Sequence, residues 1–463
     1  MRALALALLG TAAGCSLLFD GKDLLGKGAA AGDMAVGGRG DDLGPGADDL
    51  ALSGDLAGST GTDLAGNDMA RLCTTRSAIA FTATPVTSGA TKPASLTTGD
   101  FNEDGQLDVA VLNEGDPNGT PAVPGKISIL LGKGDGSFAP AAGSPHSVCN
   151  APHSITSGRF AGAHRDLIVG CKDTTGAAGS STVQLLKGNG NGTFAAAAAI
   201  GAITTTDEVN ALVTADFDHD GSDDLALCRY DNIGSNAGHT QIFFQVGGVF
   251  SAGPIVEPYT CDHLTATDVN GDSRPDLIIT YADNSLSIVR SHAVSTDASP
   301  SVTFTASDYY GPTDDVNYFT ATGDFNNDSH PDIVIGISPR SVGTIGLAGV
   351  MLFSTSLNDY PMAPALYNSP SGTIIDVGVG DFDCDGKLDL VAASVLDDTL
   401  NILRGKGDGT FNGVGPSLTI NRPSDLVIAD LNGDHLPDII AASRATTGSV
   451  GETTFTVLLN ASQ

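Results

Sequence analysis

The chain has 463 residues, with 54 acidic and 22 basic side chains and a formal charge of −32 at pH 7. This excess of carboxylates repels the phosphates of nucleic acids, and no basic cluster offsets it, so the composition argues against nucleic-acid binding. Metal cations are the ligands that such a charge favours.

Residues 1–14 have the pattern of a secretory signal: one arginine, a short apolar run, then small residues. The run falls short of the roughly 20 apolar residues of a membrane span. The end of this segment, "AAGC", resembles a bacterial lipobox, although Ala12 stands where leucine is usual. The resemblance implies lipidation of Cys15, and Ser16 after it implies the outer membrane or cell surface. Simple secretion with an ordinary cleavage site is the alternative.

Residues 15–76 consist largely of Gly, Ala, Asp and Leu. Too few bulky apolar side chains are present to offset the entropy of ordering this segment, so we expect a disordered tether. The protein would then contact the membrane through its lipid anchor only. We expect a monomer.

From residue 77 to 463, short runs with alternating apolar residues are separated by turn signals, a pattern typical of many short strands. An acidic stretch recurs six times in this region. It begins at Asp100, Asp216, Asp268, Asp324, Asp381 and Asp430. The first gap is twice the others, and midway through it "SGRFAGAHRDLIV" (157–169) keeps the flanking strand pattern without the carboxylates. Seven repeats are therefore predicted, one of which has lost its acidic positions.

Three Gly-rich turns, as in "LLGKGDGSF" (130–138), separate two further strands in their repeats. Each repeat thus supplies four antiparallel strands, and radial repetition of such sheets predicts an all-β, seven-bladed β-propeller. The residues after the last acidic stretch suffice for the second and third strands of the last blade but not for the fourth. We expect the segment 78–89 to supply the fourth and to close the ring.

The acidic stretches, their "GDF" lead-ins and the Gly-rich turns resemble FG-GAP or VCBS repeats, the family that contains the propeller of integrin α-subunits. The resemblance covers residues 77–463. It is specific to the fold, and not to one function.

Each acidic loop, "DFDCDGKLD" for example, offers side-chain oxygens at positions 1, 3, 5 and 9 and a carbonyl at position 7. This spacing resembles an EF-hand loop and suits calcium better than magnesium, which requires stricter octahedral geometry. We expect up to six calcium ions with a structural role. The predicted ligands are Asp100, Asn102, Asp104, Gln106 and Asp108; Asp216, Asp218, Asp220, Ser222 and Asp224; Asp268, Asn270, Asp272, Arg274 and Asp276; Asp324, Asn326, Asp328, His330 and Asp332; Asp381, Asp383, Asp385, Lys387 and Asp389; and Asp430, Asn432, Asp434, Leu436 and Asp438.

Position 6 favours glycine because the turn requires a positive φ. Ser273, Ser329 and His435 stand there in three loops, which predicts weaker ion affinity. Asparagine at position 3 keeps an oxygen ligand and reduces the repulsion between carboxylates. Histidine side chains within the loops are not expected to bind the ion.

Six cysteines remain after Cys15, an even number that suggests disulfides in an exported chain. In the propeller topology, the acidic loops and Gly-rich turns share one face, here called the bottom face, and the links between blades lie on the opposite top face. This arrangement favours three pairs: Cys149 with Cys171, Cys228 with Cys261, and Cys73 with Cys384.

The sequence contains none of the familiar catalytic fingerprints, so a binding or adhesion scaffold for a protein or polysaccharide is the leading functional hypothesis. A sugar-binding lectin and a polysaccharide-active enzyme are the alternatives, and the absence of Trp weakens the first. Most of the eight tyrosines map to the top face of blades 3 to 6. Tyr259, Tyr309 and Tyr310 are the candidates for partner binding, whereas Tyr360 is expected in the core.

Overall fold

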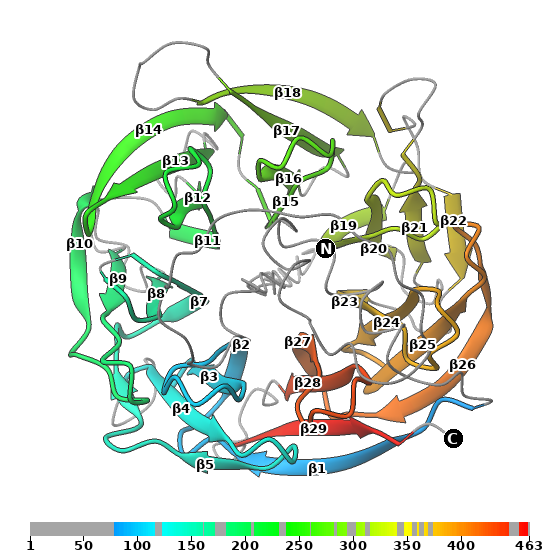
Figure 1. Cartoon of the computed structure of the whole chain (residues 1–463), viewed down its shortest axis with the longest axis horizontal. Coiled ribbons are helices and arrows are strands. Elements are labelled where there is room, and N and C mark those ends of the chain that lie inside the picture. Colours follow the sequence, from blue (N-terminus) through cyan, green and yellow to red (C-terminus); the bar gives the residue numbers. More distant parts are fainter. Residues whose placement is uncertain are drawn as a thin grey trace, which may run out of the picture.

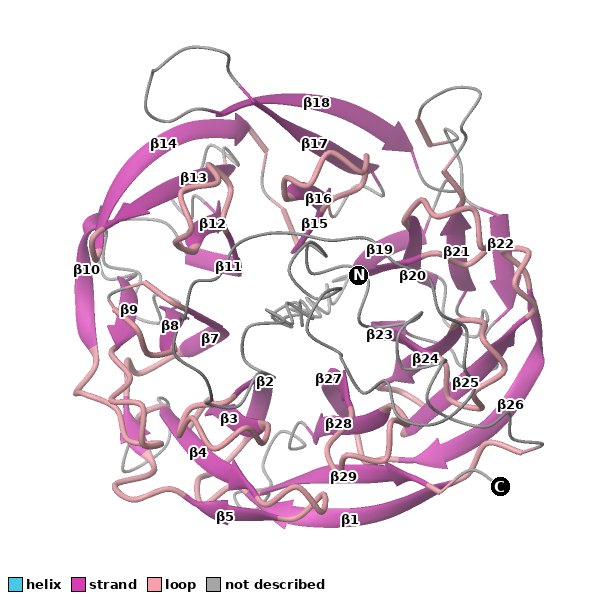
Figure 2. Cartoon of the chain, in the orientation of Figure 1, coloured by secondary structure: helices cyan, strands magenta, loops and turns pink. Residues whose placement is uncertain are grey.

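The computed structural model describes residues 78–115, 123–160, 162–171, 182–204, 208–230, 238–259, 261–281, 285–293, 302–310, 315–339, 347–353, 359–360, 365–368, 374–443 and 453–461. Within these ranges the regular structure is entirely β-strand (Figure 2), and no helix capable of crossing a membrane occurs there. The predicted signal peptide, the lipidated Cys15 and the tether lie outside the described residues.

Seven antiparallel sheets stand around a central axis, which confirms the predicted seven-bladed propeller (Figure 1). In each blade the first strand is innermost and the fourth is outermost. Blade 1 contains β2 (Pro93–Gly99), β3 (Asp108–Asn113), β4 (Lys126–Gly132) and β5 (Phe138–Pro140), and β6 (His146–Ser147) also pairs with β4. Blade 2 contains β7 (Pro152–Gly158), β8 (Asp166–Cys171), β9 (Thr182–Leu186) and β10 (Ala198–Thr204). Blade 3 contains β11 (Glu208–Ala215), β12 (Asp224–Tyr230), β13 (His239–Val246) and β14 (Val249–Glu257).

The next three blades repeat the same order. Blade 4 contains β15 (His263–Thr267), β16 (Asp276–Thr280), β17 (Ser285–Ala293) and β18 (Val302–Tyr310). Blade 5 contains β19 (Asp315–Gly323), β20 (Asp332–Pro339), β21 (Leu347–Met351) and β22 (Ala365–Asn368). Blade 6 contains β23 (Ile374–Gly380), β24 (Asp389–Ser394), β25 (Thr399–Gly405) and β26 (Phe411–Thr419).

Blade 7 is assembled from both ends of the propeller sequence. It contains β27 (Pro423–Ala429), β28 (Asp438–Ser443) and β29 (Thr454–Asn460), and its outermost strand is β1 (Phe81–Thr87). β1 pairs with β29 over its whole length, from Phe81 opposite Asn460 to Thr87 opposite Thr454 (Figure 1). The expected closure of the ring by the N-terminal strand is therefore present.

The buried apolar side chains form seven clusters among the described residues, and each cluster joins two neighbouring blades. At several junctions the aromatic residue at position 2 of an acidic loop packs against the aromatic residue after the hairpin of the next blade. The ring pairs are Phe101 with Phe194, Phe160 with Phe250, Phe217 with Phe304, and Phe325 with Phe411. Burial of these rings makes each acidic loop part of a blade junction.

Candidate metal-binding loops

Each acidic loop connects the first and second strands of its blade and has the same internal hydrogen bonds. The carboxylate at position 1 accepts the N–H groups of positions 5 and 6, and the carboxylate at position 5 accepts the N–H of position 7. In the blade 1 loop these bonds measure 3.0 Å to Asp104 N, 2.9 Å to Gly105 N and 2.8 Å to Gln106 N. The other five loops repeat the pattern. The backbone thus holds the oxygens of positions 1 and 5 in fixed directions before any ion binds.

The aspartate at position 9 has a second role that the spacing did not reveal. Asp108 is fully buried, and its two oxygens accept N–H groups from Phe101 in the loop and Gly132 at the end of the third strand, both at 2.8 Å. The equivalent residues in the other acidic loops bind the same two backbone positions. Position 9 therefore ties the loop to the third strand across the second, whether or not it also contacts an ion.

Blade 2 separates these two roles. Its loop has lost the carboxylates of positions 1, 3 and 5, yet it keeps Asp166, which is buried and accepts the Gly188 N–H at 2.8 Å. Because Asp166 persists where no acidic cluster remains, the position 9 carboxylate is a structural element of every blade. In the sequence, the retention of Asp166 in a repeat without the other carboxylates was the signal that could have indicated this structural role.

Two loops bring three carboxylates close together. Oxygens of Asp216, Asp218 and Asp224 in blade 3, and of Asp381, Asp383 and Asp385 in blade 6, lie within 4.8 Å of one another, so either group could hold a metal ion. The remaining four acidic loops have asparagine at position 3. The all-oxygen donor sets fit a hard cation. Ligation by each individual residue of the six predicted sets, including the position 7 carbonyls, stays a prediction.

Burial and mutual repulsion disfavour the ionised form of these carboxylates. Burial, which is the largest cause, and the neighbouring loop carboxylates together raise the pKa of Asp224 and Asp389 to about 8. The pKa is raised in the same way to about 7 for Asp108, Asp276, Asp332 and Asp438. Backbone hydrogen bonds oppose the shift in each case. A bound divalent cation would supply the missing positive charge.

Position 6 has a left-handed backbone in all six loops. The φ angle is 83° at Gly105, and it is 68°, 67° and 66° at Ser273, Ser329 and His435. A side chain at such an angle costs on the order of 1 kcal/mol relative to glycine. Position 4 is also left-handed in these loops, and the loops of blades 4 and 7 have glycine there, so only the blade 5 loop, with Asn327 and Ser329, carries a side chain at both left-handed positions. The expected weaker affinity of the three loops remains a prediction.

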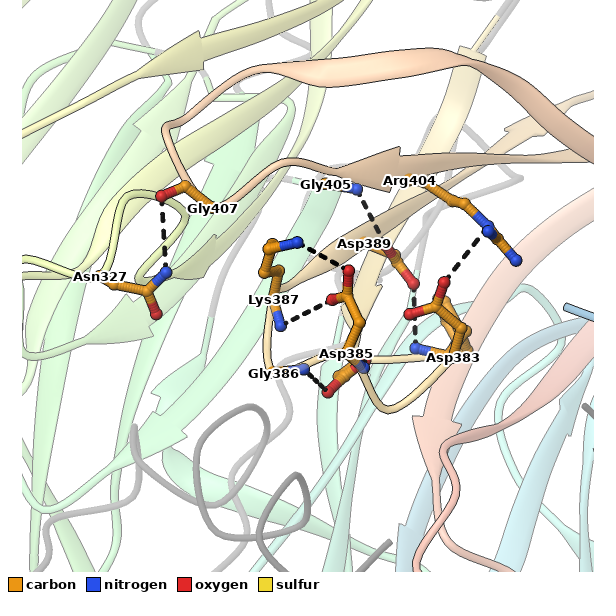
Figure 3. A network of polar contacts seen from close by, with 11 residues as sticks. Asn327, Asp383, Asp385, Gly386, Lys387, Asp389, Arg404, Gly405 and Gly407 are labelled. Atoms are coloured by element: carbon orange, nitrogen blue, oxygen red, sulfur yellow. Dashed lines mark hydrogen bonds and ion pairs between the residues drawn. The ribbon is translucent and has the colours of Figure 1, made fainter. Parts of the chain in front are cut away.

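The Gly-rich hairpins of the bottom face join neighbouring loops. The N–H groups of Gly136, Gly192 and Gly409 donate to position 2 carbonyls of the preceding blade, at 3.2, 2.9 and 2.8 Å. In addition, Asn327 of the blade 5 loop donates to the carbonyl of Gly407 in the blade 6 hairpin at 3.5 Å (Figure 3). The acidic loops and the hairpins therefore recur together because each hairpin binds the loop of the preceding blade.

Tyr360 replaces a hairpin glycine at one junction. Its side chain is 3% exposed, as expected for a core residue, and its hydroxyl donates to the carbonyls of Pro331 at 2.5 Å and Val269 at 3.3 Å. Val269 is the position 2 residue of blade 4, so a side chain here makes the bond that a glycine N–H makes elsewhere.

The cysteines and tyrosines of the top face were placed from topology alone. Disulfides join Cys149 to Cys171 and Cys228 to Cys261, two of the three expected pairs. Cys384 is also disulfide-bonded, and its expected partner Cys73 lies outside the described residues.

The tyrosines differ strongly in exposure. Tyr259 is 62% exposed, and its ring packs edge-on against Tyr281 with centroids 6.2 Å apart. Tyr281 is only 5% exposed and belongs to the core. Tyr309 and Tyr310 lie on β18 opposite Leu286 and Ser285, and their side chains are outside the described part of the structure.

Comparison with known proteins identifies the repeats. A family model described as FG-GAP-like repeat matches residues 164–227, 268–335 and 381–441. No curated protein matches the chain. Among solved structures, the periplasmic gluconolactonase PpgL of Pseudomonas aeruginosa is similar, with 13% identity and a TM-score of 0.48 over 72% of this chain and 87% of that one. A likeness of this degree says nothing about activity.

Proposed function

Since the chain carries FG-GAP-like repeats on a seven-bladed propeller, we propose that it is a calcium-stabilised scaffold that binds a protein or polysaccharide outside the cytoplasm. The observation that carries the calcium role is the set of backbone hydrogen bonds shared by six acidic loops, two of which bring three carboxylates within 4.8 Å of one another. Calcium suits such flexible all-oxygen sites. The N-terminal sequence supports export and a lipid anchor at Cys15.

The proposed binding surface lies on the top face around Tyr259. This tyrosine follows β14 and stands two residues before Cys261, whose disulfide with Cys228 fixes the link between blades 3 and 4. Its ring rests on buried Tyr281 and leaves most of its area in solvent. A rigid, exposed tyrosine offers apolar area with a polar tip at low entropic cost, which is common at binding surfaces.

A glycan array and a panel of polysaccharide hydrolase substrates, both probed with the purified chain in 1 mM calcium, test the binding role against its two alternatives. Binding without turnover supports a scaffold or lectin, and the identity of the bound glycans separates these two. Hydrolysis of any panel substrate would contradict the scaffold role. The Tyr259→Ala variant is measured in parallel, because a loss of binding in this variant would locate the contact on the top face.

A further inference from the structure

The acidic loops differ in how they relieve the repulsion between positions 3 and 5. In three loops with asparagine at position 3, the side-chain amide donates to the position 5 carboxylate. The bonds run from Asn102 to Asp104 at 2.9 Å, from Asn326 to Asp328 at 3.0 Å and from Asn432 to Asp434 at 3.1 Å. The loops of blades 3 and 6 have aspartate at position 3 and lack this amide donor.

In the blade 6 loop, two basic side chains take the place of the asparagine amide (Figure 3). The Arg404 Nε lies 3.3 Å from Asp383 Oδ2, and the Lys387 Nζ lies 2.9 Å from Asp385 Oδ2. Asp383 is 3% exposed, and its other oxygen, Oδ1, is buried without a hydrogen-bond partner. A buried carboxylate oxygen of this kind is costly unless a cation binds it. The loop is thus half neutralised by the protein and retains one free ligand atom.

The position of Arg404 follows from the closure of the ring. Leu131, Leu352 and Leu459 occupy the same place at the end of the third strand in blades 1, 5 and 7. Each leucine lies against a hairpin glycine of the next blade, namely Gly192, Gly409 and Gly136. Blade 7 has no such hairpin, since β1 supplies its outer strand. Lys187 and Arg290 stand at the same place in blades 2 and 4, and Arg290 pairs with Asp359 of blade 5. Arg404 has no such hairpin beside it and instead reaches the loop of its own blade.

Blade 3 shows the same association. Asp218 at position 3 is buried, and it interacts electrostatically with Arg274 of the blade 4 loop. Both loops that keep aspartate at position 3 therefore face an arginine.

We propose that Arg404 is a resident counter-cation that lowers the ion affinity of the blade 6 loop while it stabilises the loop in the absence of the ion. This inference rests on the proposed calcium role and concerns the regulation of one site. Arg404 and the ion compete for Asp383, so loss of the arginine has opposite effects on the two states. A unit charge about 6 Å from a divalent ion in a water-like dielectric changes affinity by about tenfold.

Hydrogen exchange of the purified full chain, titrated with calcium and read on peptides that cover 381–389, tests this proposal at the site itself. Arg404→Gln is expected to lower the calcium concentration at half-maximal protection by about tenfold, and to lower the melting temperature in EDTA. Peptides from the other five loops are internal controls and should not shift.

Two further variants separate charge from structure. Arg404→Lys keeps the charge and should behave like the wild type, and Lys406→Gln removes a nearby charge that no loop contact uses. An unchanged or raised midpoint in Arg404→Gln overturns the counter-cation role. Absence of calcium protection at all six loops of the wild type would overturn the proposed calcium function itself, and this inference with it.

Discussion

The side-chain amide of Asn460 donates a hydrogen bond of 2.9 Å to the carbonyl of Phe382. Asn460 is the last residue of β29, and Phe382 is the position 2 residue of the blade 6 loop. At three other junctions a hairpin glycine of the next blade makes this bond, but blade 7 has no such hairpin. The ring of Phe81 on β1 packs against Phe382 with centroids 5.7 Å apart, in the place of a hairpin phenylalanine. The two ends of the propeller sequence together replace one missing hairpin.

Asn460→Ala should therefore weaken ring closure. The variant leaves the Phe382 carbonyl without this donor, which is expected to lower the free energy of unfolding by about 1–3 kcal/mol. Denaturant unfolding gives the magnitude, and hydrogen exchange of residues 79–87 should accelerate because β1 is held at this junction. Asn412→Ala, at an exposed position of β26, is the control. Unaltered exchange in β1 would refute the role of Asn460.

The structural role of position 9 predicts a difference between two kinds of aspartate. Asp166→Asn replaces one oxygen of a buried carboxylate by an amide donor and should destabilise the protein by about 1–3 kcal/mol equally in calcium and in EDTA. Asp104→Asn, at exposed position 5, keeps one oxygen that can accept the Gln106 N–H, so it should cost stability mainly in calcium, where the charge of a proposed ion ligand is lost. Thermal melts of both variants in both buffers check this, and a calcium-dependent effect of Asp166→Asn would be contrary to expectation.

Asp376 and Asp425 form a fully buried carboxyl pair on β23 and β27, the inner strands of blades 6 and 7. Asp376 accepts the Leu426 N–H at 2.7 Å, and Asp425 accepts the Leu96 N–H at 2.8 Å, so the pair bonds across two junctions. Burial raises the pKa of Asp376 to about 7, and burial and the neighbouring Asp376 raise that of Asp425 well above its ordinary value. The Ser95 hydroxyl also faces Asp425 and lowers its pKa.

The pair predicts a pH dependence of stability. Between the ordinary carboxyl pKa of about 4 and the raised values, the folded state binds more protons than the unfolded state, so stability falls as the pH rises. Asp425→Asn mimics the protonated pair and should be more stable relative to the wild type at pH 8 than at pH 4.5. Melts in saturating calcium measure the difference. Parallel pH profiles for the two proteins would exclude a shared proton.

The top-face tyrosines predict a loss of binding without a loss of stability. Once a ligand is identified, simultaneous replacement of Tyr259, Tyr309 and Tyr310 by alanine should weaken its affinity at least tenfold, a change of about 1.4 kcal/mol. The calcium-dependent melt should not change, because Tyr259 is largely exposed. Isothermal titration calorimetry measures the affinity. An affinity equal to that of the wild type in the triple variant would mean that these tyrosines have no role in binding.

The fold could be predicted from the sequence because its signals are local and repeated: alternating apolar residues, six acidic stretches and Gly-rich turns. The number and spacing of the repeats also predicted the repeat that has lost its acidic positions and the strand that closes the ring. Features that depend on contacts between segments distant in the sequence could not be predicted. The bond from Asn460 to Phe382, the pair of Arg404 with Asp383 and the burial of Tyr281 each join segments distant in sequence. The two backbone bonds of position 9 were also missed, since ligand spacing alone resembles an EF-hand loop.

Thermal unfolding of the purified chain in 1 mM calcium and in EDTA tests the central claim that metal ions bound to the acidic loops stabilise the propeller. With a Kd of about 0.1 mM, each loop would contribute about 1.4 kcal/mol at 1 mM calcium, and six loops about 8 kcal/mol. Such a sum is comparable to the whole stability of a typical domain, about 5–15 kcal/mol. The account predicts a sharp fall in the melting temperature in EDTA that added calcium reverses. An identical melting temperature in the two buffers would contradict it.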